Sequence, residues 1–326
     1  MDIKGIKELY GPQEARVEAL IQATLSSDIA LLDQTNRQLR AHPGKMLRPL
    51  LALVVASACG GITEDTIRFA AAAELLHNST LLHDDVVDGA TERRGVPTVA
   101  KLLNSSAAVL LGDYWLTRTL KVVLSADHDA DRVLRIFSST LGHLAEGELL
   151  QMQKAAEGDT TQEDYLRIIY GKTASLFEAT ALSAAISAGA PEAQVQAVGK
   201  YARNLGTAFQ IKDDIFDYAA PAEEIGKPVG IDLKEQKITQ PLLCALEKVS
   251  PEEASAVRSR VTRVADEPSL ADGIRAFVYA HAGVEDASAK MEEMVEEALS
   301  ALDALEDSAE KSYLVSLAHY VTGRSV

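Results

Sequence analysis

The sequence predicts an all-α protein, and three observations support this fold class. Apolar residues make up 47% of the 326 residues, aromatic residues only 5%, and just 10 Pro and 20 Gly interrupt the chain. This composition is typical of long helices rather than of sheets. Apolar residues recur at helical spacing along most of the chain, and no segment alternates convincingly as a strand does. Because no linker marks a domain boundary, we expect a single domain over residues 1–326.

The expected helices follow from this periodicity and from the residues that interrupt it. Residues 12–40 form one amphipathic helix that a His-Pro-Gly break at 42–44 ends. A nearly all-apolar helix at 45–61 is central to the fold, since a helix that is apolar on all sides must be buried. A helix at 63–88 precedes a loop at 89–98. Further helices are expected at about 104–126, 129–156, 160–188, 191–219, 238–249, 251–267, 268–283, 285–303 and 306–322, with a loop at 220–237.

The helix at 63–88 ends in three aspartates, Asp84, Asp85 and Asp88, directly before Gly89. Asp84 and Asp88 lie four residues apart and therefore share a helix face. The C-terminal end of a helix carries partial negative charge, so carboxylates there need a positive partner. A hard divalent cation suits them, because magnesium often links one or two carboxylates to substrate phosphates.

The same spacing occurs again in Asp213, Asp214 and Asp217, late in another apolar helical run. One such cluster is easily a solvated helix end. Two identical clusters, each flanked by apolar residues and followed by cations, indicate two metal sites.

Charge and cysteine content exclude other classes. The net charge of −16 argues against nucleic-acid binding, which needs a basic face. The two cysteines, Cys59 and Cys244, make no metal-ligand spacing and suit a reducing compartment. The N-terminal residues lack a secretory signal, and no apolar run approaches a membrane span. We therefore expect a soluble, cytoplasmic protein without stable membrane insertion.

With these motifs placed, the chain resembles the trans-isoprenyl diphosphate synthases of the polyprenyl synthetase family, most closely the long-chain members. The resemblance runs nearly end to end. It implies a single helical bundle of the isoprenoid synthase type around a central cavity. The segments that carry it are PGKMLRP (43–49), HNSTLLHDDVVDGATERRGVPT (77–98), LLGDYWLTR (110–118), EGELLQ (146–151), GKTASLF (171–177) and FQIKDDIFDYAAPAEEIGKPVGIDLKEQKITQPLL (209–243).

The resemblance implies head-to-tail addition of isopentenyl diphosphate to an allylic diphosphate, such as farnesyl or geranyl diphosphate. Both aspartate sets then hold the allylic diphosphate through Mg²⁺, with three ions in each active site when substrate is bound. The metals and nearby cations stabilise the charge that grows on the leaving diphosphate. The cations that match the family are Arg93, Lys172, Lys227 and Lys237. Gly171 before Lys172 and Thr173 after it, in mid-helix, predict a local break where polar groups reach a ligand.

The other site residues also come from the resemblance. Thr173 and Gln210 are expected near the allylic cation. The diphosphate of the second substrate is held without a metal by Lys45, Arg48, His77 and Arg94, with Phe209 near its hydrocarbon part. Lys45 and Arg48 stand at a helix start, where anions bind well.

Chain length is predicted from the turn before Asp84. Short-chain members tend to have bulky aromatic side chains there, whereas this chain has Ser79 and Thr80. The growing product then passes toward the helix at 104–126, where Trp115 is one residue able to form a deeper floor. We expect a product of about eight isoprene units (about C40) by family analogy.

Several alternatives stay open. One is a medium-chain geranylgeranyl or farnesyl diphosphate synthase. A class I terpene cyclase shares the fold, but its second metal site usually mixes Asn, Ser and Glu. A di-iron carboxylate bundle needs paired ExxH motifs, and only Glu74 to His77 supplies one. The family also implies a homodimer, with the helices near 104–156 as its candidate interface.

Overall fold

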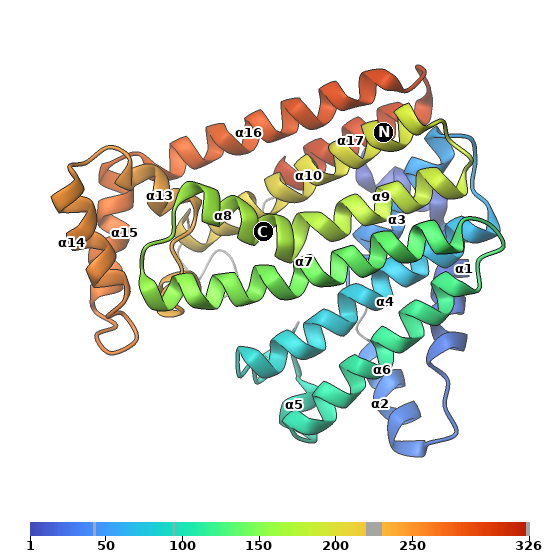
Figure 1. The fold of residues 1–326 in the computed structure, drawn as a ribbon, viewed down its shortest axis with the longest axis horizontal. Coiled ribbons are helices and arrows are strands. Elements are labelled where there is room, and N and C mark those ends of the chain that lie inside the picture. The colour runs from blue at the N-terminus through green and yellow to red at the C-terminus, as the bar shows by residue number, and fades with distance from the viewer. Residues whose placement is uncertain (42–43, 94, 220–229, 324–326) are drawn as a thin grey trace. The chain divides into compact units, whose positions relative to one another are not determined.

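The computed structural model describes residues 1–41, 44–93, 95–219 and 230–323, and over these residues the chain is almost entirely helical (Figure 1). This confirms the all-α prediction. The helices are α1 (Ile3–Leu25), α2 (Ala30–Arg40), α3 (Leu47–Ala58), α4 (Glu64–Val87), α5 (Val99–Leu102), α6 (Ser105–Leu124), α7 (Ala130–Glu157), α8 (Gln162–Ile169), the π-helix η1 (Tyr170–Ala174), α9 (Ser175–Ser187), α10 (Glu192–Ala219), α12 (Ile231–Lys234), α13 (Gln240–Leu246), α14 (Pro251–Val261), α15 (Leu270–Ala280), α16 (Gly283–Ala301), the 3₁₀ helix η2 (Leu302–Ala304) and α17 (Ala309–Gly323).

The chain forms two compact units. Unit 1 consists of Met1–Ser138, Ala179–Gly199 and Ala304–Ser316, and unit 2 of Ser139–Glu178, Lys200–Asp303 and Leu317–Val326. The first aspartate set belongs to unit 1 and the second to unit 2. The single domain over residues 1–326 stays a prediction.

Unit 1 is built around α4. This helix packs along α6 and also contacts α1 and α3 (Figure 1). Every residue of α3 from Pro49 to Ala56 is buried, as expected for an all-apolar helix. Thr63 caps α4, because its hydroxyl accepts the Thr66 N–H while the Thr66 side chain bonds back to the Thr63 N–H.

In unit 2, α13 packs on α16 and α15. Its residues from Gln240 to Leu246 are all buried. Within the described parts of both units, no helix combines the length and the apolar run needed to cross a bilayer.

Two predictions of secondary structure were wrong: the loop predicted at 220–237 contains the short helix α12 in its described part, and the first helix is divided. Residues 12–40 do not form a single helix, because α1 ends at Leu25 and α2 starts at Ala30. Ser26 adopts an extended conformation, and the Ser27 hydroxyl accepts the Ile29 N–H at 3.2 Å. Short polar side chains compete for backbone groups in this way and so interrupt a helix despite apolar periodicity.

The loop at 89–98 contains a small hairpin that periodicity did not reveal. Strands β1 (Glu92–Arg93) and β2 (Val96–Pro97) pair antiparallel. Strands of two residues are too short to show alternation in a sequence. The hairpin matters because it brings Arg93 back toward the end of α4.

Candidate active site

The first aspartate set lies at the end of α4, as predicted. Asp88 is the C-cap residue, and Gly89 follows with φ +60°. Asp84 is half-buried and Asp88 is exposed, whereas Asp85 between them is 5% exposed. The set is therefore divided into two accessible carboxylates on one helix face and one buried carboxylate.

Asp85 is held by Arg93 from the hairpin. The Arg93 Nε donates to Asp85 Oδ1 at 2.6 Å. Burial raises the pKa of Asp85 above its ordinary value, and Arg93 counteracts this only in part. Arg93 thus pairs with the buried carboxylate of the first set. Its predicted contact with the diphosphate stays a prediction.

The second aspartate set lies near the end of α10 and has the same division. Asp213 and Asp217 are half-buried, and Asp214 is 4% exposed. Asp214 accepts the Tyr165 hydroxyl at 2.6 Å and the Gln210 side-chain amide at 2.9 Å. Burial raises the pKa of Asp214 to about 7, although both hydrogen bonds lower it.

Thr173 and Gln210, which the sequence predicted as functional, lie together in unit 2. The Thr173 hydroxyl donates to Gln210 Oε1 at 2.8 Å, and Gln210 in turn donates to Asp214. A chain of hydrogen bonds therefore links the GKT segment to the second aspartate set.

The predicted break at Lys172 is confirmed as the π-helix η1. Such turns are rare and are frequent at functional sites. The wide turn lies directly against α7, because a Cβ added at Gly171 would stand 2.5 Å from the His143 carbonyl oxygen. Lys172 Nζ binds Glu148 Oε2 at 2.8 Å, and Gln151 donates to Glu148 Oε1.

Asp217 binds backbone groups at the start of α12. Its two carboxylate oxygens accept the backbone N–H groups of Ile231 and Asp232, each at 3.0 Å. Asp232 is partly buried here, and burial together with the charges of Asp214 and Asp217 raises its pKa well above the ordinary value.

A cavity of about 140 Å³ in unit 2 is lined by polar side chains from several helices, namely Gln151, Tyr165, Lys172, Gln210, Asp214, Asp232 and Lys237. The sequence matched Gln151 and Asp232 to family segments but gave them no distinct role, and it gave Tyr165 and Glu148 none. The contacts of Tyr165, Glu148 and Asp232 join separate helices, so only the folded structure shows them.

The residues predicted for the second diphosphate lie in both units. Lys45 and Arg48 stand at the start of α3, where Met46 has φ +51°. His77 is half-buried on α4, two turns before Asp84. Phe209 lies in unit 2, with its ring 5.7 Å from that of Phe177. Arg94 and Lys227 lie outside the described residues.

Ser79 and Thr80 do not line the cavity that the structure shows in unit 1. Ser79 is 1% exposed, and its hydroxyl donates to the Gly112 carbonyl of α6 at 2.9 Å. The Thr80 hydroxyl bonds to the His77 carbonyl. The cavity instead meets α4 at Glu74, Asn78, Leu81, Leu82 and Asp85, and Trp115 of α6 lines it too. The role of Ser79 and Thr80 in chain length stays a prediction.

The chemistry of both aspartate sets fits magnesium. Among the described residues, no three His, Cys, Asp or Glu side chains form a complete metal cluster. Each set instead offers two accessible carboxylates and no softer ligand. Magnesium is commonly bound by one or two carboxylates, with substrate phosphates and water completing its octahedron.

Comparisons with known proteins agree with this arrangement. The polyprenyl synthetase family profile matches residues 29–275. The chain is 37% identical to the octaprenyl diphosphate synthase of Escherichia coli over 99% of each protein. A crystal structure of a decaprenyl diphosphate synthase from Rhodobacter capsulatus has a TM-score of 0.90 at 35% identity, covering 98% of both chains.

A second structure is the polyprenyl synthase of Caulobacter crescentus, solved with calcium and isoprenyl diphosphate. It has a TM-score of 0.88 at 31% identity and covers 98% of this chain and 97% of its own. With the family profile spanning most of the sequence and both aspartate sets in place, the chain belongs to the polyprenyl synthetase family and is a prenyltransferase.

Proposed function

We propose that this prenyltransferase is a Mg²⁺-dependent, all-trans polyprenyl diphosphate synthase. It extends an allylic diphosphate, farnesyl or geranyl diphosphate, by successive additions of isopentenyl diphosphate. The observation that carries this proposal is the shared construction of the two aspartate sets. In each set two accessible carboxylates flank one that is buried and hydrogen-bonded.

The residues of each set have distinct tasks in this proposal. Asp84, Asp88, Asp213 and Asp217 hold magnesium ions and through them the allylic diphosphate. The bound ions supply positive charge to the diphosphate as it leaves. Lys172, Lys237, Lys227 and Arg93 add to that charge. Lys45, Arg48, His77 and Arg94 bind the diphosphate of isopentenyl diphosphate, because guanidinium groups suit two-point phosphate contact.

Asp85 and Asp214 position their neighbours in this scheme. Each is buried and hydrogen-bonded, so each fixes the end of its helix rather than presenting a free carboxylate. Thr173 and Gln210 are tied to Asp214, which places their oxygens at the second set. A polar oxygen there stabilises the positive charge that develops on the allylic carbon.

A direct assay tests this function. The protein is incubated with Mg²⁺, farnesyl diphosphate and labelled isopentenyl diphosphate, and apolar products are extracted and separated by length. Label in a linear prenyl product supports the synthase. A cyclic hydrocarbon made from farnesyl diphosphate alone indicates a terpene cyclase. Absence of any product, together with strong iron binding, indicates a carboxylate bundle.

The length of the product is part of the proposal. An octaprenyl relative and a decaprenyl structural neighbour support a long chain, and we expect about eight isoprene units. The variant Ser79→Phe tests the predicted path beside α4, and we expect its products to stop at about fifteen to twenty carbons. Ser79→Ala is the matched control. Wild-type length from a folded Ser79→Phe variant contradicts this path.

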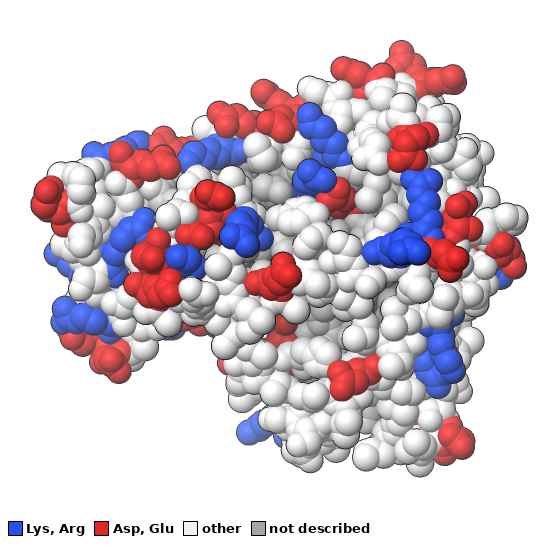
Figure 2. All heavy atoms as spheres, in the orientation of Figure 1, with Lys and Arg blue, Asp and Glu red and all other residues white. Residues whose placement is uncertain are grey.

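The expected homodimer has support on α5 and α6. Leu110 and Leu124 are 68% and 55% exposed, and Leu102, Leu103 and Val109 are exposed nearby. Uncharged side chains predominate over α6 in Figure 2. Exposed apolar patches of this kind often mark protein interfaces. Light scattering on Leu110→Glu should show a lower mass than the parent protein, whereas a monomeric parent contradicts the proposal.

A further inference from the structure

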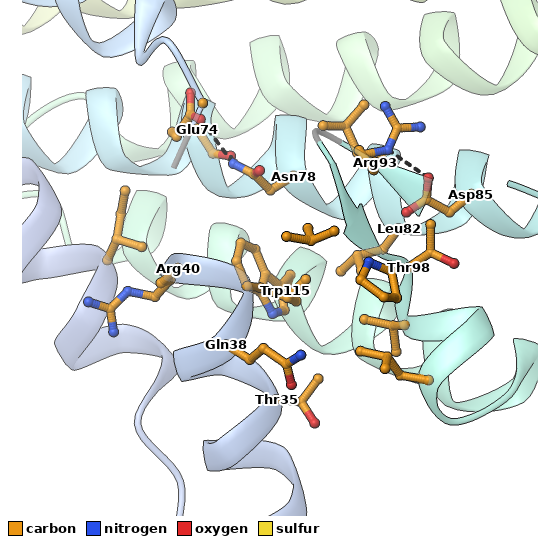
Figure 3. A pocket seen from close by; sticks show the side chains of 18 of the residues that line it. Thr35, Gln38, Arg40, Glu74, Asn78, Leu82, Asp85, Arg93, Thr98 and Trp115 are labelled. Atoms are coloured by element: carbon orange, nitrogen blue, oxygen red, sulfur yellow. Dashed lines mark hydrogen bonds and ion pairs between the residues drawn. The ribbon is translucent and has the colours of Figure 1, made fainter. Parts of the chain in front are cut away.

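Unit 1 contains a cavity of about 240 Å³. Its walls come from α1, α2, α4, the hairpin, α5 and α6, and Figure 3 shows Leu82 and Trp115 near its middle. The walls are mainly apolar and include Leu39, Leu81, Val99 and Leu102. Asp84, Asp88, Lys45, Arg48 and His77 are not among the lining residues, so the cavity shares only Arg93 with the groups assigned to the two diphosphates.

One end of this cavity carries a buried carboxylate. Glu74 is 5% exposed, and the Asn78 side-chain amide donates to its Oε1 at 3.0 Å. Its other oxygen, Oε2, accepts no hydrogen bond from any residue that the structure describes. Because Glu74 lines the cavity, this end favours a ligand that can donate a hydrogen bond to its carboxylate.

Arg40 of α2 lies at the same end (Figure 3). Its guanidinium forms no ion pair or hydrogen bond with the described residues. Glu18 lines the cavity too, so the lining has two carboxylates, Glu18 and Glu74, and one guanidinium, Arg40, in addition to the pair of Asp85 and Arg93. At the other end Asp85 and Arg93 neutralise each other. The cavity as a whole is therefore slightly acidic, which disfavours a diphosphate or carboxylate head group.

We propose that this cavity binds a linear apolar alcohol. A hydroxyl group suits the polar end, because it can donate to Glu74 Oε2 and accept from the Arg40 guanidinium without carrying charge. The apolar walls then bury the hydrocarbon tail and remove its CH₂ groups from water, which favours binding. Most ligand pockets have this construction, with apolar walls and a few polar groups that fix the orientation.

Trp115 makes the inference directly testable. It lines the cavity and is the only tryptophan in the chain. Its fluorescence in the full-length protein therefore reports the occupancy of this cavity. The titration uses farnesol, 1-dodecanol or farnesyl diphosphate in EDTA, where the prenyl transfer reaction is off. We expect a saturable change in Trp115 emission with the alcohols.

Two variants separate the head and tail contacts. Arg40→Met should weaken farnesol binding about tenfold, which is the effect of losing one hydrogen bond to a charged group. Leu39→Phe should fill part of the cavity and weaken both alcohols. Arg37→Met is the matched control, because Arg37 lies on the same helix with its side chain 70% exposed and outside the cavity.

The outcomes are distinct. Tighter binding of farnesol than of 1-dodecanol supports an isoprenoid alcohol as the occupant, and equal binding supports apolar alcohols in general. The proposal is overturned if Trp115 emission shows no saturable change, or if Arg40→Met and Leu39→Phe bind like Arg37→Met. It is also overturned if farnesyl diphosphate changes the emission at lower concentration than farnesol. None of these results depends on turnover, so they stand apart from the test of the proposed function.

Discussion

The two aspartate sets share one sequence spacing, but their buried carboxylates are stabilised by different groups. Asp85 is held by a cation, Arg93, eight residues further along the chain. Asp214 is held by neutral donors, the Tyr165 hydroxyl and the Gln210 amide, and Tyr165 is 49 residues away. The pKa of Asp85 is raised, and that of Asp214 is raised to about 7.

This difference shows what the DDxxD spacing does and does not specify. The spacing fixes which carboxylates share a helix face, and therefore which two remain accessible. It does not specify how the buried one is paired. A counter-charge stabilises the ionised form of a carboxylate far more than neutral donors do, so the two sets should respond differently to substitution and to pH.

The largest expected effect falls on the accessible carboxylates and should be equal in the two sets. Asp84→Ala and Asp213→Ala each remove an acidic group from a set proposed to hold magnesium. We expect kcat to fall about a hundredfold or more in each variant, as when a major electrostatic stabiliser is lost. The measurement is steady-state turnover at saturating Mg²⁺, with circular dichroism to confirm unchanged helix content.

The control for these variants is Asp272→Ala, an exposed aspartate in the first turn of α15. It should leave kcat unchanged. Near-normal turnover of Asp84→Ala would remove the first set from the proposed site, and the same result for Asp213→Ala would remove the second.

The sequence was sufficient for the parts of the fold that depend on local pattern. Both α4 and α10 carry their aspartates in their C-terminal part, as apolar periodicity predicted. The interruption at Lys172 was also visible, because glycine beside polar residues in mid-helix is a local signal. The gap between α1 and α2 was missed, because apolar spacing continues through Ser26 and Ser27 and hides the polar competition there.

The support of the site could not be predicted from the sequence. The resemblance assigned Arg93 to the diphosphate, and its ion pair with Asp85 was not predicted although the two residues are only eight positions apart. Tyr165, Glu148 and Asp232 are ordinary residues of their own segments, and their roles arise from contacts across helices. No periodicity encodes the hydrogen bond from Tyr165 to Asp214, since it depends on how α8 packs against α10.

The second-largest expected effect is the loss of stability when the buried Asp85 loses its cation. Arg93→Met leaves Asp85 buried without its cation. We expect the free energy of unfolding in EDTA to fall by about 2 kcal/mol, the usual order for stranding a buried group that was paired with a charge. Chemical denaturation measures it. Asp85→Asn combined with Arg93→Met should recover part of the loss, because the double variant removes both charges. An additive double variant would mean that the pair contributes nothing.

A smaller effect is expected in the second set. Tyr165→Phe removes one neutral hydrogen bond to Asp214 and leaves the Gln210 amide in place. The expected loss in free energy of unfolding is about 1 kcal/mol. The same denaturation experiment measures it under identical conditions. If the loss equals or exceeds that of Arg93→Met, the distinction between ionic and neutral support does not hold.

The smallest expected effect concerns how the free energy of unfolding depends on pH. The pKa of Asp214 rises from 3.8 to about 7 on folding, so between these values the folded protein binds more protons than the unfolded chain. Stability from this group is therefore fully present below about pH 4 and is lost as pH rises toward 7. The raised pKa of Asp232 acts in the same direction. Asp214→Asn should accordingly reduce this pH dependence without abolishing it.

Tyr165→Phe should move the upper end of this loss to higher pH, because the Tyr165 hydrogen bond lowers the pKa of Asp214. We expect a shift of less than about one pH unit, since desolvation and not this bond is the main cause of the raised pKa. Denaturation series between pH 4 and pH 8 in EDTA measure it. Tyr279→Phe is the control, because its hydroxyl donates to the Tyr218 carbonyl, which does not titrate. A shift to lower pH in Tyr165→Phe, or an equal shift in both variants, contradicts the role assigned to this hydrogen bond.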